Sequence, residues 1–574
     1  MLRIPATICG ISLLLCCGLP CRAQKPAAEG CARPAAGSAV PEPEDLHSDN
    51  GVLEVDLAMR NDVGPDGHMR YCYVAGDGSQ SPNLRLRPGD LLILRLKNQL
   101  SESAQQAPAR QHMHSAANST SDPCVRGEMS AITTNLHFHG MAIPPVCHQD
   151  DVLRTAIDPS DAPFEYRVRI PAEQPPGLYW YHPHIHGFAE SKILGGASGA
   201  LIIEGIERVN PKLAGLPERV LVVRDQPLAN PNAQPAQTGS MPPPNVLRDA
   251  EGDILNAGND GGMPARDLSI NQVPVSFPNY EPAVITMKPS ERQLWRVLNA
   301  SADTYLDVQV LFAGAPQFLG VVALDGVPIA ANGSDPHQVL WESHIALPPA
   351  GRAEFVINGP PAGTPASFVT RKVDTGRDGE NDPTRPLATI VVAADAAEPR
   401  ATLAAITQPA IRPALPWLGS VKPVRERKLY FWERPQDPSD PKSPIVYGIT
   451  EDGRAPEPFD PQATEPDISV EQGTVEDWVI ENRTQEVHAF HIHQLHFLLQ
   501  DWNGVPIEEP YLRDTINVGY WDGRSPQYPS VKLRMDFRDP EIIGTFVYHC
   551  HILEHEDGGM MGEIRVMAAA TAKR

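Results

Sequence analysis

Short runs of alternating hydrophobic and polar residues recur along most of the chain, which is the pattern of β-strands with one buried face. The pattern is clear in residues 51–57 and in residues 84–96, where a Pro-Gly-Asp turn separates two apolar stretches. Further strand-like runs occupy residues 200–204, 221–225, 293–300 and 353–357. The 60 prolines and 44 glycines suit a chain rich in turns. The sequence therefore predicts an all-β protein built from antiparallel sandwiches.

The strand-like runs fall into three groups. A chain of 574 residues is too long for one hydrophobic core, so several domains are expected. We predict a first domain at residues 46–205, a second at 206–395 and a third at 423–574, with a proline- and alanine-rich linker at 396–422. Residues 101–130 are polar and poor in hydrophobic side chains, and we expect them to form a surface loop.

The N-terminus has the features of a secretory signal peptide. Residues 1–23 combine a single Arg3, an apolar run at residues 4–19 and an exit rich in small residues. Residues 24–45 are rich in alanine and proline and are predicted to form a disordered leader. No later stretch is long and apolar enough for a membrane span. We therefore expect an exported protein, periplasmic or extracellular, with no membrane-spanning segment.

Charge and cysteine content narrow the possible partners and the compartment. A formal net charge of -23 disfavours nucleic acid as a partner. Of the nine cysteines, those outside the signal peptide are Cys31, Cys72, Cys124, Cys147 and Cys550. An oxidising compartment permits disulfides, and the first four of these cysteines can pair in three ways. We prefer the pair Cys124–Cys147, because both residues lie in predicted loops that flank the same strand.

Histidine pairs separated by one residue stand at four places in the chain outside the polar insertion. Side chains i and i+2 of a strand share one face, so each pair can present two imidazoles to the same metal site. A single such pair is more often structural, but four pairs favour a metal cluster held between the first and third predicted domains. The pairs are His137 with His139, His182 with His184, His491 with His493, and His549 with His551.

The last histidine pair flanks a cysteine, and this arrangement predicts a second site. Side chains alternate along a strand, so Cys550 points to the opposite face from its two histidine neighbours. His555 and Met560 follow at short distances, and His488 stands three residues before the third pair. Two histidines, one cysteine and a weak axial methionine are typical of a blue copper site. The alternative interpretation is a buried cysteine between two structural histidines.

These motifs, in this order, resemble those of a three-domain multicopper oxidase of the laccase type. The resemblance covers residues 50–567 and includes all four histidine pairs. It implies three consecutive cupredoxin-like Greek-key β-sandwich domains, of which the second supplies no metal ligand. It also implies four copper ions, one of type 1, one of type 2 and two of type 3.

The family pattern assigns a ligand set to each type of copper. For type 1 copper the resemblance implies His488, Cys550, His555 and, in the axial position, Met560. For type 2 copper it implies His137 and His491. For the type 3 pair it implies His139, His182, His184, His493, His549 and His551. His186 and His496 lie beside these residues and are expected to orient the ligands.

The resemblance further implies an enzyme, a copper-dependent oxidoreductase that uses dioxygen as the electron acceptor. Single electrons from a donor would be collected at type 1 copper, and dioxygen would be reduced to water at the cluster. Glu556 and Asp150 match positions where related enzymes carry carboxylates that relay protons. The choice of Asp150 over Asp151 stays open at this point.

The donor is expected to be a phenol or an aromatic amine, with a cuprous, ferrous or manganous ion as the alternative. The third domain has no methionine-rich segment, which disfavours the cuprous ion. Glu486, close to His488 in the sequence, would orient a phenol or bind a cation. A non-enzymatic copper carrier is a further alternative, but a carrier needs only the blue site.

Overall fold

The structure is a computed structural model, and it describes residues 30–102, 122–127, 129–230, 248, 254–256, 262–329, 338–404, 415–440 and 443–569. The predicted signal peptide, residues 1–23, lies outside the described residues, as does most of the polar insertion at 101–130. None of the helices in the described part is long and apolar enough to cross a membrane.

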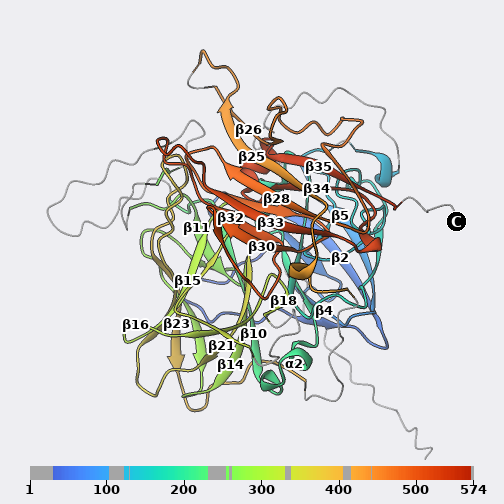
Figure 1. The fold of residues 1–574 in the computed structure, drawn as a ribbon. Coiled ribbons are helices and arrows are strands. Elements are labelled where there is room, and N and C mark those ends of the chain that lie inside the picture. The colour runs from blue at the N-terminus through green and yellow to red at the C-terminus, as the bar shows by residue number, and fades with distance from the viewer. Residues whose placement is uncertain are drawn as a thin grey trace, which may run out of the picture.

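Six β-sheets form three β-sandwiches that follow one another along the chain, which confirms the predicted all-β fold (Figure 1). In Figure 1 the third sandwich, orange to red, lies across the top of the view, above the blue first sandwich and the green-to-yellow second one. Among the described residues the α-helices are short. They are α1 (Ala189–Leu194), α2 (Ile206–Val209) and α3 (Leu553–Asp557).

The first sandwich contains strands β1 to β9. Its five-stranded sheet has the order β1 (Asp45–His47), β4 (Asn83–Leu86), β9 (Gly199–Ile203), β8 (Gly177–His182) and β6 (His137–His139). Its four-stranded sheet has the order β3 (Met69–Ala75), β2 (Val52–Val63), β5 (Leu91–Gln99) and β7 (Phe164–Arg169). Buried and exposed side chains alternate along much of β2, as the hydrophobic pattern predicts.

The second sandwich contains strands β10 to β24. The larger sheet has the order β12 (Val273–Val275), β11 (Asp267–Ile270), β10 (Pro217–Gln226), β14 (Arg292–Asn299), β21 (Arg352–Asn358), β17 (Leu319–Leu324) and β18 (Val327–Pro328). In addition, β19 (Leu340–Glu342) pairs with β17, and β24 (Ala401–Thr402) pairs with β10. The smaller sheet has the order β13 (Ala283–Met287), β23 (Arg385–Val392), β22 (Ala366–Thr370), β15 (Leu306–Phe312) and β16 (Ala315–Pro316), with β20 (Ile345–Leu347) on β15. Strand β24 falls within the predicted linker.

The third sandwich contains strands β25 to β35. One sheet has the order β26 (Ile445–Glu451), β25 (Arg425–Pro435), β28 (Thr474–Asn482), β33 (Ser530–Phe537), β30 (Phe497–Trp502) and β31 (Val505–Pro506). The other has the order β27 (Ile468–Glu471), β35 (Met561–Met567), β34 (Gly544–Cys550), β29 (His488–Ile492) and β32 (Thr515–Val518). Helix α3 connects β34 to β35.

One sheet of each sandwich repeats the same strand pairing. β2 pairs with β3 antiparallel and with β5 parallel. In the second sandwich β10 pairs in the same way with β11 and β14, and in the third β25 does so with β26 and β28. The three sandwiches therefore share one topological unit.

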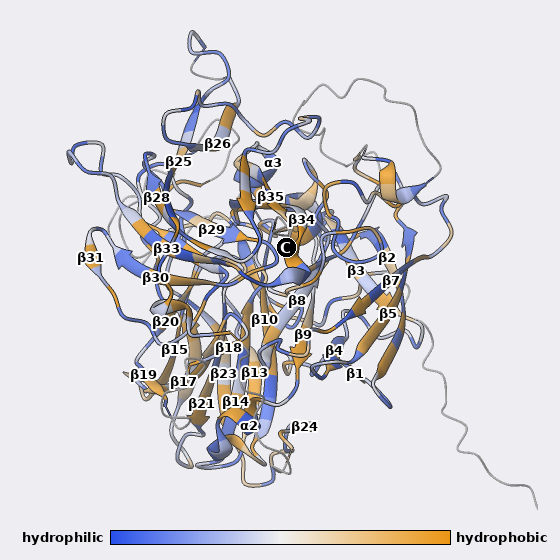
Figure 2. Ribbon diagram, turned by 45° about the vertical axis from the view of Figure 1, so that its right-hand side comes forward, coloured by the Kyte–Doolittle hydropathy of each residue, from blue (hydrophilic) through white to orange (hydrophobic). Residues whose placement is uncertain are grey.

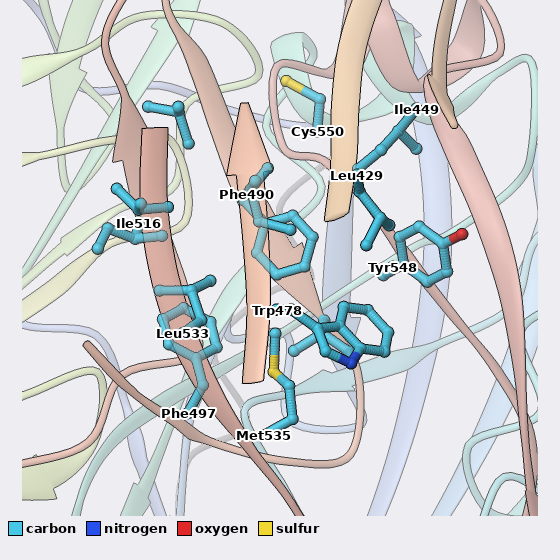
Figure 3. Close-up of a cluster of buried hydrophobic side chains, with 14 of the residues drawn as sticks. Leu429, Ile449, Trp478, Phe490, Phe497, Ile516, Leu533, Met535, Tyr548 and Cys550 are labelled. Carbon is cyan, nitrogen blue, oxygen red and sulfur yellow. The ribbon is translucent and has the colours of Figure 1, made fainter. Parts of the chain in front are cut away.

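Hydrophobic side chains fill the space between the paired sheets. Figure 2 shows hydrophobic residues concentrated in the strands and hydrophilic residues in many of the connecting loops. In the third sandwich Trp478, Phe490, Leu533 and Met535 belong to one buried cluster, and Cys550 lies at its upper end in Figure 3. Burial of this apolar surface is the main stabilising contribution to the sandwich, and it also fixes the position of Cys550.

Residues 30–45 differ from the predicted disordered leader. Cys31 is buried and disulfide-bonded to Cys72 of β3. The backbone N–H of Val40 donates to the carbonyl of Val284 in β13 at 2.8 Å. This segment therefore connects the first sandwich to the second. The prediction is wrong for these residues because composition does not reveal a covalent cross-link or a backbone pairing with a distant strand.

A second disulfide joins Cys124 to Cys147, which confirms the preferred pairing. Cys124 lies in a 3₁₀ turn, Pro123–Val125, and Cys147 lies in the loop that follows β6. Among the cysteines in the described part of the chain, Cys550 is the free one, and it is buried. Its thiol is therefore available as a ligand.

Candidate metal centre

Eight histidines from the first and third sandwiches meet in one buried cluster. Strands β6 and β8 pair in a register that places His137 opposite His182, and β29 and β34 pair with His491 opposite His549. Each of the eight side chains is at most 2% exposed. The structure thus brings together all four predicted pairs. They are His137, His139, His182, His184, His491, His493, His549 and His551.

The ring nitrogens of this cluster lie close enough to share metal ions. Groups whose potential ligand atoms all lie within 4.8 Å of one another are His184–His493–His549, His137–His139–His182 and His137–His491–His493. Nε2 of His493 lies 3.2 Å from Nε2 of His549. The rings of His139, His182 and His551 have centroids 5.2 to 5.7 Å apart. The cluster therefore divides into small sets of imidazoles, as a site for several ions requires.

Backbone carbonyls orient three of the rings. The contacts are His182 Nδ1 to Pro183 O at 3.0 Å, His491 Nδ1 to Asp514 O at 2.8 Å and His549 Nδ1 to Cys550 O at 2.9 Å. A carbonyl oxygen can only accept a hydrogen bond, so Nδ1 carries the proton in each case. The Nε2 atom of each ring then keeps a free lone pair. Neutral histidine with a free ring nitrogen is the form that binds a metal.

Buried ring nitrogens without a hydrogen-bond partner among the described residues support a metal site. They are His137 Nε2, His139 Nδ1, His182 Nε2, His184 Nε2, His491 Nε2, His493 Nδ1 and both nitrogens of His551. Buried polar atoms are almost always hydrogen-bonded, so this many at one place requires an explanation. Burial also lowers the pKa of His137, His139 and His182 well below the usual value, which favours neutral imidazole. A set of neutral imidazoles fits copper.

A second candidate centre lies on the other face of β34, around Cys550. Nδ1 of His488 lies 3.6 Å from Cys550 Sγ, and Nδ1 of His555 lies 3.8 Å from it. The two Nδ1 atoms are 3.1 Å apart. Met560 is fully buried in the same hydrophobic cluster as Cys550, and its carbonyl accepts a hydrogen bond from the Cys550 N–H. The structure thus gathers the four residues predicted for the blue copper site.

Each histidine of this second centre is held through its outer nitrogen. Nε2 of His488 lies 2.8 Å from Oγ1 of Thr484. Nε2 of His555 lies 3.1 Å from Oε1 of Glu486, and the Tyr447 ring stacks on His555 with centroids 4.5 Å apart. These contacts direct both Nδ1 atoms towards the cysteine, which is how outer partners orient metal ligands.

Asp150 touches the histidine cluster from the first sandwich. Its Oδ2 lies 3.0 Å from Nδ1 of His137, its Oδ1 accepts a hydrogen bond from the Phe138 N–H at 3.0 Å, and the Gln494 amide donates to Oδ2. Burial raises the pKa of Asp150 to about 8. Asp151 instead accepts a hydrogen bond within its own loop. The structure therefore places Asp150, and not Asp151, against the cluster.

Glu556 touches the same cluster from the third sandwich. It lies in α3, directly after His555, and its side chain is fully buried. Its Oε2 lies 3.0 Å from Nδ1 of His549, and its Oε1 lies 3.6 Å from Nε2 of His184. Both carboxylates predicted to relay protons therefore lie in contact with histidines of the cluster.

A cavity of about 380 Å³ opens beside His555. Its carboxylate residues are Asp303, Asp378, Glu380, Asp382, Glu433, Glu486 and Glu554, and among the described residues Arg434 is the basic side chain other than His555 that lines it. Burial, together with the adjacent and hydrogen-bonded carboxyl group of Glu486, raises the pKa of Glu433 well above the usual value. Arg266 pairs with Asp303 and Glu380, and Arg385 pairs with Asp382. The acidic feature beside His555 is therefore the carboxyl pair Glu433 and Glu486.

Sequence reasoning missed several residues of the two centres. Thr484 and Glu433 carry no recognisable spacing signal. Gln494 follows the third histidine pair and has a positive φ of 60°, a conformation that is uncommon for a residue other than glycine. Asp514 also contacts the cluster, and Arg352 binds Asp514 from a distant part of the chain. Only the folded structure shows these contacts.

Comparisons with known proteins agree with this geometry. Two sequence families, both described as multicopper oxidase, match residues 126–208 and 438–570. The multicopper oxidase mco of Staphylococcus aureus is 22% identical over 84% of this chain and 81% of its own length. A multicopper oxidase from Campylobacter jejuni, described as a metallo-oxidase, has a TM-score of 0.61 and 23% identity and covers 93% of this chain and 96% of its own.

A laccase-like multicopper oxidase from Ochrobactrum sp. has a TM-score of 0.59 and 20% identity over 92% of this chain and 100% of its own. These two structural likenesses concern the fold. The two matched sequence segments, however, contain all eight histidines of the cluster together with Cys550 and His555. The two segments that carry the candidate ligands therefore match the multicopper oxidase family, and the fold of the whole chain is similar to that of solved multicopper oxidases.

Proposed function

We propose that this protein couples the one-electron oxidation of a small donor to the reduction of dioxygen to water, with four bound copper ions. The observation that carries the proposal is the joint presence of the Cys550 centre and the eight-histidine cluster on opposite faces of β34. Copper, when bound, supplies one-electron redox chemistry at the first centre and binds and reduces dioxygen at the second. A copper carrier would need only the first centre.

We divide the ligands as the family pattern implies, and the close approach of His184, His493 and His549 supports one of the sets. Type 1 copper would be held by His488, Cys550, His555 and Met560. Type 2 copper would be held by His137 and His491. The type 3 pair would be held by two sets, His139 with His182 and His551, and His184 with His493 and His549. Cys550 would give a covalent path between the centres, because its backbone continues on both sides into cluster histidines.

We further propose that two carboxylates supply protons. Glu556 and Asp150 are both buried and both lie about a hydrogen bond away from a cluster histidine. Reduction of dioxygen to water consumes protons, and a positioned carboxyl group is an effective donor. We assign proton transfer to these two residues, Glu556 from the third sandwich and Asp150 from the first.

We also propose that the protein is exported to the periplasm or the extracellular space. Two disulfides lie in the first sandwich and its leader segment, and disulfides persist in oxidising compartments. The apolar run near the N-terminus fits the same proposal. The form found in the oxidising compartment should begin after residue 23, which N-terminal sequencing of the exported protein would test.

Among the possible donors, the carboxyl pair beside His555 favours cations. Glu433 and Glu486 are adjacent, and ionising both carboxyl groups is energetically unfavourable unless a positive charge lies between or beside them. A ferrous, manganous or cuprous ion would supply that charge close to His555. A protonated aromatic amine is the second candidate. A neutral phenol gains less from these carboxylates, although the cavity also has apolar walls such as Ile445 and Ile552.

The test is oxygen consumption by the copper-loaded protein with ferrous, manganous and cuprous ions, an aromatic diamine and a neutral phenol as separate donors. We expect Glu433→Gln and Glu486→Gln to raise the KM for the preferred metal ion about 10- to 100-fold, the loss expected when a charged partner is removed. The KM for the phenol should change less than about threefold. Glu54→Gln, an exposed carboxylate on β2, is the matched control.

Two outcomes would contradict this donor assignment. Fast turnover with the phenol and none with metal ions would show a laccase-like specificity. An equal rise in KM for the phenol and the metal ion would show that the two glutamates shape the cavity without recognising charge. A copper-loaded protein that consumes no oxygen with any donor would contradict the proposed oxidase activity itself.

A further inference from the structure

A buried ion pair between Arg352 and Asp514 lies where the three sandwiches meet. Arg352 begins β21 of the second sandwich, and Asp514 directly precedes β32 of the third. Nη1 and Nη2 of Arg352 donate to Oδ1 and Oδ2 of Asp514 at 2.7 and 2.6 Å, and both side chains are fully buried. Two parallel charge-assisted hydrogen bonds fix the distance and the angle between the groups.

Asp514 in turn contacts two histidines of the cluster. Its Oδ1 lies 3.4 Å from Nε2 of His139, which comes from the first sandwich. Its backbone carbonyl accepts a hydrogen bond from Nδ1 of His491 at 2.8 Å. Both contacts place the ring proton on the outer nitrogen. The opposite nitrogens, Nδ1 of His139 and Nε2 of His491, are buried and have no hydrogen-bond partner in the described part of the chain.

All the donors of the Arg352 guanidinium are used. Nε donates to the carbonyl of Leu178 at 3.2 Å, Nη1 also donates to that of Ala350 at 3.2 Å, and Nη2 also donates to that of Asp325 at 2.9 Å. Together with the two bonds to Asp514, these contacts account for the five N–H groups of an arginine. Leu178 belongs to β8, so the same side chain joins all three sandwiches. Lysine has neither the number nor the planar arrangement of donors.

Gly140 leaves room for this ion pair. It follows His139 and has a φ of +83°, which a side chain would strain. A Cβ atom there would lie 2.6 Å from both Arg352 Nη2 and Asp514 Oδ2. The close approach of the ion pair to the His139 strand therefore requires glycine at this position, and this is a constraint independent of the hydrogen bonds.

We propose that Arg352 and Asp514 are positioning residues of the histidine cluster. The second sandwich, which supplies no predicted ligand, fixes the ring orientation and proton position of His139 and His491 through this pair. The inference rests on the ligand assignment in the proposed function. Its consequence is that loss of Arg352 disturbs type 2 copper and the adjacent type 3 ion, while type 1 copper at Cys550 is retained.

The experiment uses the copper-loaded full chain and its Arg352→Gln variant. The copper content per chain is measured after dialysis against a chelator. The blue absorption band reports on type 1 copper, and the electron paramagnetic resonance signal of type 2 copper reports on the cluster. Loss of an outer partner weakens metal binding about 10- to 100-fold. We expect cluster copper to be lost or its resonance parameters to shift, with the blue band unchanged.

Two further variants separate positioning from general stability. Asp514→Asn keeps the size of the side chain and the backbone carbonyl that holds His491. We expect it to show the same shift in the type 2 signal. If Arg352→Gln does not fold, Asp514→Asn provides the test. Arg352→Lys should restore the signal only in part. Arg427→Gln removes another buried ion pair, to Glu476 in the third sandwich, and should leave the cluster signal unchanged.

The outcomes distinguish this inference from the proposed function. A wild-type protein that binds no copper at the cluster would contradict the proposed function. Suppose the wild-type protein binds all four ions and the Arg352→Gln and Asp514→Asn variants have the same copper content and the same resonance parameters. That result would overturn only the positioning role. Equal copper loss in Arg427→Gln would also overturn it, because the effect would then follow from general destabilisation.

Discussion

Cys550→Ser should abolish the blue absorption band and lower donor oxidation at least about 10³-fold, the kind of loss seen when a reacting group is removed outright. The Cys550 sulfur lies 3.6 and 3.8 Å from the two Nδ1 atoms of its centre. A serine hydroxyl is a poor substitute for a thiolate as a copper ligand. Electrons from the donor would then have no path to the cluster.

Copper analysis and oxygen consumption measured together check this result. Cys550 is not a ligand of the histidine cluster, so copper bound at the cluster should remain. The total copper content should fall by about one ion per chain. Thr545→Ser, on the same strand but outside both centres, is the matched control and should behave as the wild type. A Cys550→Ser protein that keeps its blue band would show that this thiolate is not the ligand.

Glu556→Gln should slow the reduction of dioxygen by about 10²- to 10⁴-fold, the range that a positioned general acid contributes. The glutamine side chain has nearly the same shape but cannot release a proton. The carboxyl group of Glu556 lies 3.0 Å from His549 and 3.6 Å from His184, and Glu556 is not among the described residues that line the donor cavity. Reduction of type 1 copper by the donor should therefore proceed at the normal rate.

The measurement separates the two half-reactions. The variant is reduced by its donor without oxygen and then mixed with dioxygen, and the return of the blue band reports reoxidation. We expect normal bleaching and slow recovery, with full copper content. Glu508→Gln, an exposed residue of the same sandwich, serves as the control. Recovery at the wild-type rate would leave Glu556 without a role in proton transfer.

The two metal centres were largely predictable from local sequence patterns. His549 and Cys550 are the last two residues of β34 and His551 follows directly, so their alternation between two faces follows from strand geometry. The other three histidine pairs follow the same rule, and the structure joins all four in one cluster. The sandwiches themselves follow from the alternation of hydrophobic and polar residues, as β33 shows with buried positions at every second residue.

The N-terminal segment shows where composition fails as a guide. Residues 30–45 have the alanine- and proline-rich composition of a flexible leader, yet a disulfide to Cys72 and backbone hydrogen bonds to β13 hold them in place. A disulfide lowers the entropy of the unfolded chain and so favours order even where few apolar side chains are buried. Composition averages over residues and does not identify such single contacts.

The sequence by itself determined the fold class, the histidine and cysteine pattern and the two carboxylates next to that pattern. Only the tertiary structure decided which residues hold those ligands and what surrounds the donor. Arg352 and Asp514 are separated by 162 residues, and the cavity beside His555 is lined by residues of the second and third sandwiches. The physical reason is that strand periodicity encodes which neighbours share a face, whereas contacts between sandwiches depend on how whole sheets pack.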